Sequence, residues 1–197
     1  MQFVEPIRNP KHITQIKNQL RWSWEIRNLL LFELWINSAL RVSDLLSIQS
    51  HHLYKENWDI AESFTIKERK TWKKSKIAIT KNVKKTLLLY KDKYQQIIQE
   101  PWKYIFFTTR SLPYCTKPLT RKMAWFLINK RCKEYCNLKW SYWGHTLRKT
   151  RWFQARKNNI PIELIQHRLN HSSTTITKRY LGITDDELER VCRELDL

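Results

Sequence analysis

Hydrophobic positions along the chain predict a mostly helical protein. The segment at residues 26–38 is apolar on most sides, which is typical of a helix buried at the centre of a fold. An extended arm with two prolines, residues 1–12, and a short helix at residues 13–20 are expected before it. The stretch ALRVSDLLSI, residues 39–48, then predicts a turn into another short helix.

The pattern changes between residues 58 and 80. SFTIKE and SKIAIT alternate apolar and polar residues, which predicts two half-buried strands of a hairpin around the basic loop RKTWKKS. Helical patterns resume afterwards, with loops near the prolines at 101, 113 and 118; the expected helices are 82–99, 118–136, 146–157 and 161–169. The predicted fold class is α+β, mostly α with a small antiparallel β-sheet, in one compact domain.

The net charge of the chain indicates what kind of partner it binds. The 197-residue chain has 37 Lys plus Arg against 18 Asp plus Glu, a net charge of +19 spread along its length. Such a field attracts polyanions, most often nucleic acid. The alternative is a ribosome-like or membrane-surface protein without chemistry. The longest apolar run, LLLFELWI at residues 29–36, is far too short to span a bilayer, so no membrane anchor is expected.

The four cysteines do not predict a metal site. Cys115, Cys132, Cys136 and Cys192 form no CxxC pair, and Cys132 and Cys136 are predicted neighbours on one helix face. With no signal peptide in view, this pattern favours reduced thiols in a cytoplasm-like compartment.

Four short motifs, far apart in the chain, carry candidate chemistry. NSALRVSDLLSI contains Arg41, GHTLRKT contains His145 and Arg148 at an H-x-x-R spacing, RLNHSS contains His171, and KRYLGI contains Tyr180. Each residue alone has an ordinary explanation, such as an arginine paired with a nearby acid, a core histidine or a packing tyrosine. In this order and at these intervals they resemble the tyrosine recombinase (phage integrase) family. The resemblance covers about residues 12–183 and implies the fold of that family's catalytic domain.

The resemblance implies a role for each of these residues in cutting a DNA strand. Arg41 and Arg148 would hold the non-bridging oxygens of one phosphate as fixed bidentate donors, and His171 would add a third hydrogen bond. Tyr180 would attack the phosphorus and form a covalent 3′-phosphotyrosine, leaving a 5′-hydroxyl. His145 is the candidate base, because a phenol with a pKa of about 10 is almost fully protonated at pH 7. The phosphotyrosyl bond conserves the energy of the broken bond, so neither ATP nor a metal or other cofactor is implied.

A general acid must protonate the departing 5′-oxygen. In the family this group is a lysine in the turn between two strands, and Lys70 in the basic loop matches that position best. Lys67 and Lys73 remain alternatives, and so does a hairpin that serves only as a phosphate-contacting finger. Lys73, Lys74, Arg121 and Lys122 are candidate DNA contacts.

The sequence also departs from the family pattern. Ser38-Ala39 stands where a glycine usually precedes the first arginine's motif, Lys149 stands where the family often has a second histidine, and Asn170 replaces the glycine of LGH. None of these changes removes a catalytic group. The chain starts almost at the catalytic domain, whereas most members have an N-terminal core-binding domain, so a short stand-alone member and a piece of a longer protein are both compatible.

Residues 184–197, TDDELERVCRELDL, predict a separate C-terminal helix after the domain at 1–183. The spacing of Thr184 and Glu187 is typical of a capping box at its start. The tail either covers its own core or packs on a neighbouring protomer, as in family members. The resemblance further implies double-stranded DNA as partner, a homotetramer on DNA, and a cytoplasmic, nucleoid-associated location, or the host cytoplasm for a viral or mobile element.

The favoured function is a site-specific DNA recombinase or integrase that cleaves and rejoins strands through Tyr180. A catalytically silent DNA-binding regulator of the same fold and a type IB-like topoisomerase are the alternatives.

Overall fold

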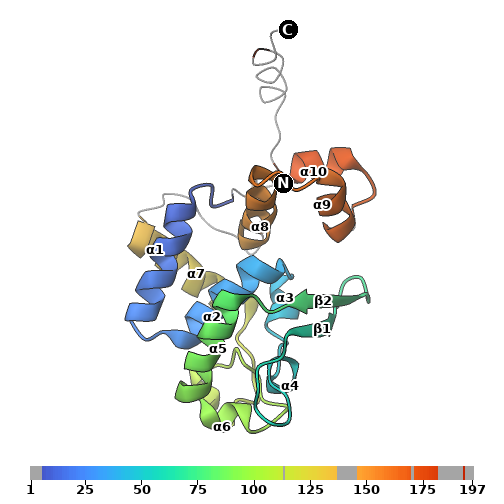
Figure 1. The fold of residues 1–197 in the computed structure, drawn as a ribbon. Helices are drawn as coiled ribbons and strands as arrows, with labels where there is room; N and C mark the ends of the chain where they lie inside the picture. Colours follow the sequence, from blue (N-terminus) through green and yellow to red (C-terminus); the bar gives the residue numbers. More distant parts are fainter. Residues whose placement is uncertain (1–5, 113, 137–145, 170, 182–192, 194–197) are drawn as a thin grey trace.

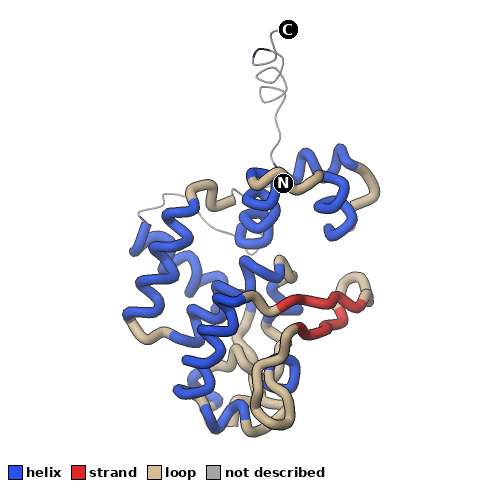
Figure 2. Tube along the Cα trace, in the orientation of Figure 1, coloured by secondary structure: helices blue, strands red, loops and turns tan. Residues whose placement is uncertain are grey.

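The computed structural model describes residues 6–112, 114–136, 146–169, 171–181 and 193. Helices dominate these residues, and one two-stranded antiparallel sheet lies among them, as the sequence predicted (Figure 2). In chain order the elements are α1 (Pro10–Trp22), α2 (Ile26–Ser38), α3 (Val42–Leu45), α4 (Ser50–Leu53), β1 (Ser63–Lys67), β2 (Lys74–Ala78), α5 (Lys81–Lys93), α6 (Gln95–Ile98), the 3-10 turn η1 (Thr109–Ser111), α7 (Arg121–Cys136), α8 (Thr146–Lys157), α9 (Ile162–Leu169) and α10 (Thr174–Leu181).

Helix α2 is the buried centre of the fold, as its apolar sequence predicted. It packs against α1, α5 and α8 (Figure 1), and most of its side chains are inaccessible to solvent. One of them is Glu33, which is 1% exposed and accepts a 2.7 Å hydrogen bond from the Thr86 hydroxyl on α5. Burial raises the pKa of this carboxyl above its usual value.

The end of α2 determines where the next helix begins. Ala39 ends α2 with a left-handed backbone, at φ 53°, and Arg41 then stands at the N-cap of α3. A left-handed residue is usually glycine, and alanine accepts that geometry at some cost in energy. The chain has only two glycines, and neither stands at this sharp turn.

The β1–β2 hairpin has one buried and one exposed face. Phe64 pairs with Ile77 and Ile66 with Ser75, and these four side chains face the interior. Lys67 pairs with Lys74 on the exposed face, so like charges lie directly opposite each other. The observed strands lie within one or two residues of the predicted ones.

Three predicted helix limits were wrong. Helix α1 begins at Pro10 because the Asn9 side chain accepts a hydrogen bond from the Lys11 amide, and proline suits a first helical position. The helix expected at 82–99 is two helices, since Tyr94 leaves the helical conformation and packs its ring against Tyr90 and Phe107. Helix α7 begins three residues after Pro118, which lies in a bridge to Phe107.

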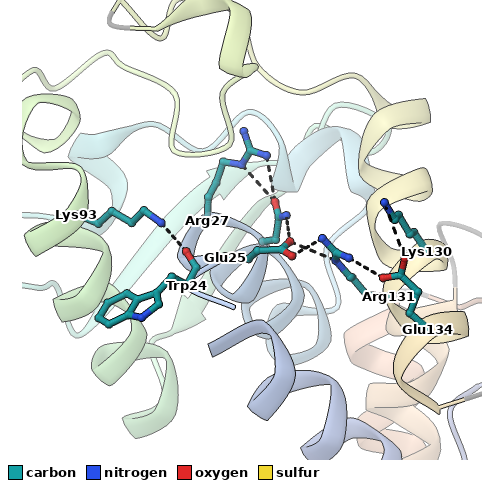
Figure 3. A network of polar contacts seen from close by, with 8 residues as sticks. Trp24, Glu25, Arg27, Lys93, Lys130, Arg131 and Glu134 are labelled. Atoms are coloured by element: carbon teal, nitrogen blue, oxygen red, sulfur yellow. Dashed lines mark hydrogen bonds and ion pairs between the residues drawn. The ribbon is translucent and has the colours of Figure 1, made fainter. Parts of the chain in front are cut away.

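A network of charged groups joins the start of α2 to α7 (Figure 3). Glu25 accepts hydrogen bonds from Arg131 on α7 and from the Asn28 side chain, and Arg131 also pairs with Glu134. Arg27 donates to Asn28 and, at 2.8 Å, to the Phe107 carbonyl. The network therefore ties α7 to the start of α2.

Helix α8 is held from two sides. On one side it packs on α2. On the other side it contacts the extended segment before α1: the Ile7 main-chain amide donates to the Thr150 hydroxyl at 2.8 Å, and the Gln154 side-chain amide donates to the Ile7 and Arg8 carbonyls. The predicted extended arm is thus seen over residues 6–9, and it supports the helix that carries Arg148.

Several predictions fall partly or wholly outside the described residues, among them His145, Asn170, Cys192 and all but one residue of the predicted tail helix. Cys132 and Cys136 both lie on α7, the first buried and the second half-buried. Within the described ranges, no helix is long and apolar enough to cross a bilayer, and no three potential metal ligands gather.

Candidate active site

Arg41 is held by an acid from the hairpin. Its Nη1 donates to Oε2 of Glu68, which follows the last residue of β1, and the Ser75 hydroxyl on β2 donates to the other carboxylate oxygen at 2.6 Å. Burial acts to raise the pKa of Glu68, but the Ser75 hydroxyl, Arg41 and Arg148 together keep it below its usual value. Glu68 is therefore a carboxylate at neutral pH.

A second contact joins α3 to the hairpin. Asp44, completely buried on α3, accepts a 3.0 Å hydrogen bond from the Arg69 amide with its Oδ1. Residues 68 and 69 of the hairpin thus contact Arg41, the N-cap of α3, and Asp44 within that helix. The loop that begins here is closed by two main-chain hydrogen bonds, from Glu68 to the Lys73 carbonyl and from Trp72 to the Glu68 carbonyl.

Arg148 lies on the first turn of α8, half-buried, between the Arg41–Glu68 pair and Tyr180. Burial lowers the pKa of its guanidinium and so does the nearby Arg41, whereas Tyr180 and Glu68 oppose the shift. An arginine remains charged regardless. Arg41 and Arg148 are therefore two fixed positive charges beside one carboxylate, Glu68, before any ligand binds.

Tyr180 projects from α10 toward Arg148 and is half-buried. Its ring packs with Ile165, Leu169 and Leu181, and it meets the His171 ring edge-on with the centroids 5.3 Å apart. Lys149 lies over the same ring, with its Nζ 5.3 Å from the centroid. Burial raises the pKa of the phenol, and the attraction of Arg148 and Arg41 offsets only part of that rise.

His171 is fixed by its main chain and by one ring nitrogen. Its amide donates to the Gln166 carbonyl and its carbonyl accepts from the Gln166 side chain, both at 3.2 Å. Its Nδ1 lies 3.1 Å from the hydroxyl of the buried Thr177. Burial, followed by the positive charge of Arg148, lowers the pKa of this imidazole, so it is neutral at pH 7.

Helices α9 and α10 are also linked to the hairpin. Arg168 on α9 donates a 3.1 Å hydrogen bond to the Lys76 carbonyl on β2. In Figure 1 the two helices lie on the same side of the body as the hairpin. This contact ties α9, and with it the α9–α10 pair that carries His171 and Tyr180, to the hairpin that carries Glu68.

Four of the six catalytic candidates come together in the structure, namely Arg41, Arg148, His171 and Tyr180. Lys70 is exposed in the hairpin loop, two residues after Glu68, and no described contact ties its side chain to the other four. Lys73 and Lys74 are exposed on the same hairpin, and Arg121 and Lys122 are exposed at the start of α7. His145 lies outside the described residues, immediately before α8.

Two residues of this site were not found by sequence reasoning. Glu68 continues the inward-facing alternation of Phe64 and Ile66, so the strand pattern already pointed its side chain toward the body. Lys149 was noticed only as a departure from the family motif. Its place over the Tyr180 ring depends on how α8 and α10 pack, which no local pattern reveals.

Comparison with known proteins identifies the chain. The model of the phage integrase family matches residues 9–187. The chain belongs to the phage integrase family. It is also 33% identical, over 187 residues, to a probable integrase/recombinase, YoeC, of Bacillus subtilis (strain 168), a match that covers 94% of this chain and 93% of that protein.

Solved recombinases have the same fold as this integrase-family chain. The crystal structure of XerA recombinase matches with a TM-score of 0.72 at 15% identity, over 100% of this chain and 67% of that one. The XerH site-specific recombinase, solved in a post-cleavage complex with difH DNA, matches with a TM-score of 0.69 at 14% identity, over 97% and 53%. The chain therefore spans about half to two thirds of these recombinases, and the predicted fold type is confirmed.

Proposed function

We propose that this protein is a site-specific DNA recombinase of the integrase type, which cuts and rejoins DNA strands through Tyr180. The observation that carries the proposal is the position of Arg148, which lies among Arg41, His171 and Tyr180 although these residues are far apart in the chain. A phosphate in this site would meet two guanidinium groups and a neutral imidazole, with a phenol beside them. Family membership supports the same reading.

In the proposed reaction the Tyr180 oxygen attacks the phosphorus of one DNA linkage. The bond from phosphorus to the 5′-oxygen breaks as the phosphotyrosyl bond forms, and Arg41, Arg148 and His171 stabilise the charge on the non-bridging oxygens. The phenol proton passes to His145, and the departing 5′-oxygen takes a proton from Lys70. Attack by the 5′-hydroxyl of another strand reverses these steps and completes the exchange.

DNA outside the cleaved linkage would be held by the basic surface. The net charge of +19, with exposed Lys73, Lys74, Arg121 and Lys122, supports binding to the phosphate backbone. Solved relatives are named as complexes with DNA. Assembly of four copies on two DNA sites, each active in turn, belongs to the same proposal.

A nicked suicide substrate tests the proposal. Cleavage near the nick releases a short fragment, so the covalent protein–DNA adduct accumulates and survives denaturation. We expect an adduct with the wild-type chain and none with Tyr180→Phe, while DNA binding is retained. Tyr94→Phe, another half-buried tyrosine, is the control and should keep the adduct.

The outcomes separate the competing functions. DNA binding without any adduct would indicate a silent regulator, and an adduct that persists in Tyr180→Phe would remove Tyr180 from its role. Relaxation of a supercoiled plasmid with one site, without exchange between two sites, would indicate a topoisomerase.

A further inference from the structure

Glu68 contacts both the basic loop of the hairpin and Arg41. Its main chain closes the loop that carries Lys70, through hydrogen bonds with Lys73 and Trp72. Its side chain accepts a hydrogen bond from Arg41. One residue thus connects the basic loop to the first arginine of the site.

Both carboxylate oxygens of Glu68 have partners. Ser75 donates to Oε1 and Arg41 donates to Oε2, so the carboxylate is held in one orientation. The contact with Arg41 is only partly exposed to solvent, with 24% of the arginine side chain and 17% of the glutamate side chain accessible. A charge-assisted hydrogen bond in such surroundings is shorter and stronger than one in open water.

The contact uses one nitrogen of the Arg41 guanidinium and leaves the others available. Within the described part of the chain, no group accepts a hydrogen bond from Nε or Nη2 of Arg41. A guanidinium has five donors in a rigid plane, so a partner on Nη1 fixes the direction of the remaining ones. Ordering a long arginine side chain in advance removes an entropy cost that substrate binding would otherwise meet.

We propose that Glu68 is a positioning residue for Arg41, which directs the free donors of the guanidinium at the phosphate to be cleaved. This inference rests on the proposed function, because it assigns Arg41 to the phosphate. The opposite role is that Glu68 occupies the phosphate position and must be displaced by DNA. The two roles predict opposite effects on rate when the charge is removed.

The test is Glu68→Gln, which keeps the size of the side chain and removes its charge. Single-turnover cleavage is measured with enzyme in excess on two suicide substrates, one with a normal scissile phosphodiester and one with a methylphosphonate at that linkage. The methylphosphonate lacks the negative charge that Arg41 would neutralise. We expect a loss of about 10- to 100-fold on the phosphodiester, somewhat less than the effect of deleting a whole oxyanion donor, and a loss below about threefold on the methylphosphonate.

DNA affinity separates positioning from binding. Because Glu68→Gln removes a negative charge near the DNA, we expect its Kd for DNA to be unchanged or lower while the cleavage rate falls. Glu62→Gln is the matched control, since Glu62 lies just before the other end of the same hairpin, pairs with Lys84 and is 79% exposed. It should leave both rates unchanged.

Ser75→Ala provides a second variant if Glu68→Gln fails to fold. It removes one anchor of the carboxylate without touching its charge, and we expect a smaller loss with the same dependence on substrate. Equal losses on both substrates, no loss at all, or faster cleavage by Glu68→Gln would each overturn the positioning role. An absence of adduct from the wild-type chain would instead overturn the proposed function and this inference together.

Discussion

We expect Thr177 to orient the His171 ring so that Nε2 faces the phosphate in the proposed reaction. A neutral imidazole carries one proton, so it donates from Nε2 only when Nδ1 is the acceptor. The Thr177 hydroxyl has one proton and two partners, Nδ1 of His171 at 3.1 Å and the Ser173 carbonyl at 3.3 Å, so Nδ1 is the acceptor only when the hydroxyl turns from Ser173 and gives that proton to the ring. Because burial and Arg148 lower the pKa of His171, the ring is neutral at pH 7 and depends on this hydroxyl to select its tautomer.

Thr177→Val removes that hydroxyl with little change in shape. Thr177 is 0% exposed, so losing its hydrogen bonds should reduce the free energy of unfolding by about 1 kcal/mol, or about 2–4 °C in Tm for a chain of this size. A similar loss in the transition state corresponds to about a fivefold slower cleavage, since about 1.4 kcal/mol is a factor of ten.

Thermal unfolding and single-turnover cleavage at saturating protein measure the two effects separately. Thr175→Val, an exposed threonine on the same helix, is the control and should change neither. A normal cleavage rate in Thr177→Val, together with the expected loss of stability, would refute the orienting role of the hydroxyl. So would a matching loss of rate in Thr175→Val.

Two further predictions concern stability and DNA binding. Burial raises the pKa of Glu33 in the folded chain, so the folded state binds a proton more readily than the unfolded state. The contribution of Glu33 to the free energy of unfolding is therefore most favourable below its unfolded pKa of about 4.3, and it is lost as the pH rises through the higher pKa of the folded chain. Glu33→Gln, followed by chemical denaturation across pH 4–8, should remove this decline and leave the chain more stable at pH 7, whereas a steeper decline would contradict the argument. Lys74→Ala should reduce the slope of log K against log salt by about 0.9 if Lys74 contacts one phosphate, and it should slightly stabilise the hairpin by relieving the pair with Lys67. A DNA titration at several salt concentrations that gave an unchanged slope would exclude that contact.

The sequence predicted the broad fold and the members of the site for different reasons. Strong periodicity gave α2, α8 and the hairpin because burial leaves a regular trace along the chain. The gathering of Arg41, Arg148, His171 and Tyr180 was expected because motif order and spacing resemble a known family, and no local pattern would have placed them together. A role carried over from the family remains a prediction for Lys70, since its side chain has no described contact that distinguishes it from neighbouring lysines.

Tertiary packing explains what the sequence did not reveal. The break at Tyr94 depends on an aromatic contact with Phe107, which is distant in the chain, so helical periodicity ran through it. The proposed role of Glu68 depends on its contact with Arg41, which exists only after the hairpin meets the start of α3. An acid among many lysines looks like an ordinary solvated charge until its partner is known.

The proposed reaction needs a group that accepts the phenol proton of Tyr180. Tyr180 remains protonated because burial raises its pKa, yet attack requires the phenol to lose its proton. Arg41 and Arg148 cannot accept a proton, and His171 cannot both donate from Nε2 to the phosphate and accept there. Glu68 is already bound by Ser75 and Arg41. None of these four groups supplies the base, so His145, adjacent in sequence to the first residue of α8, stays the predicted acceptor.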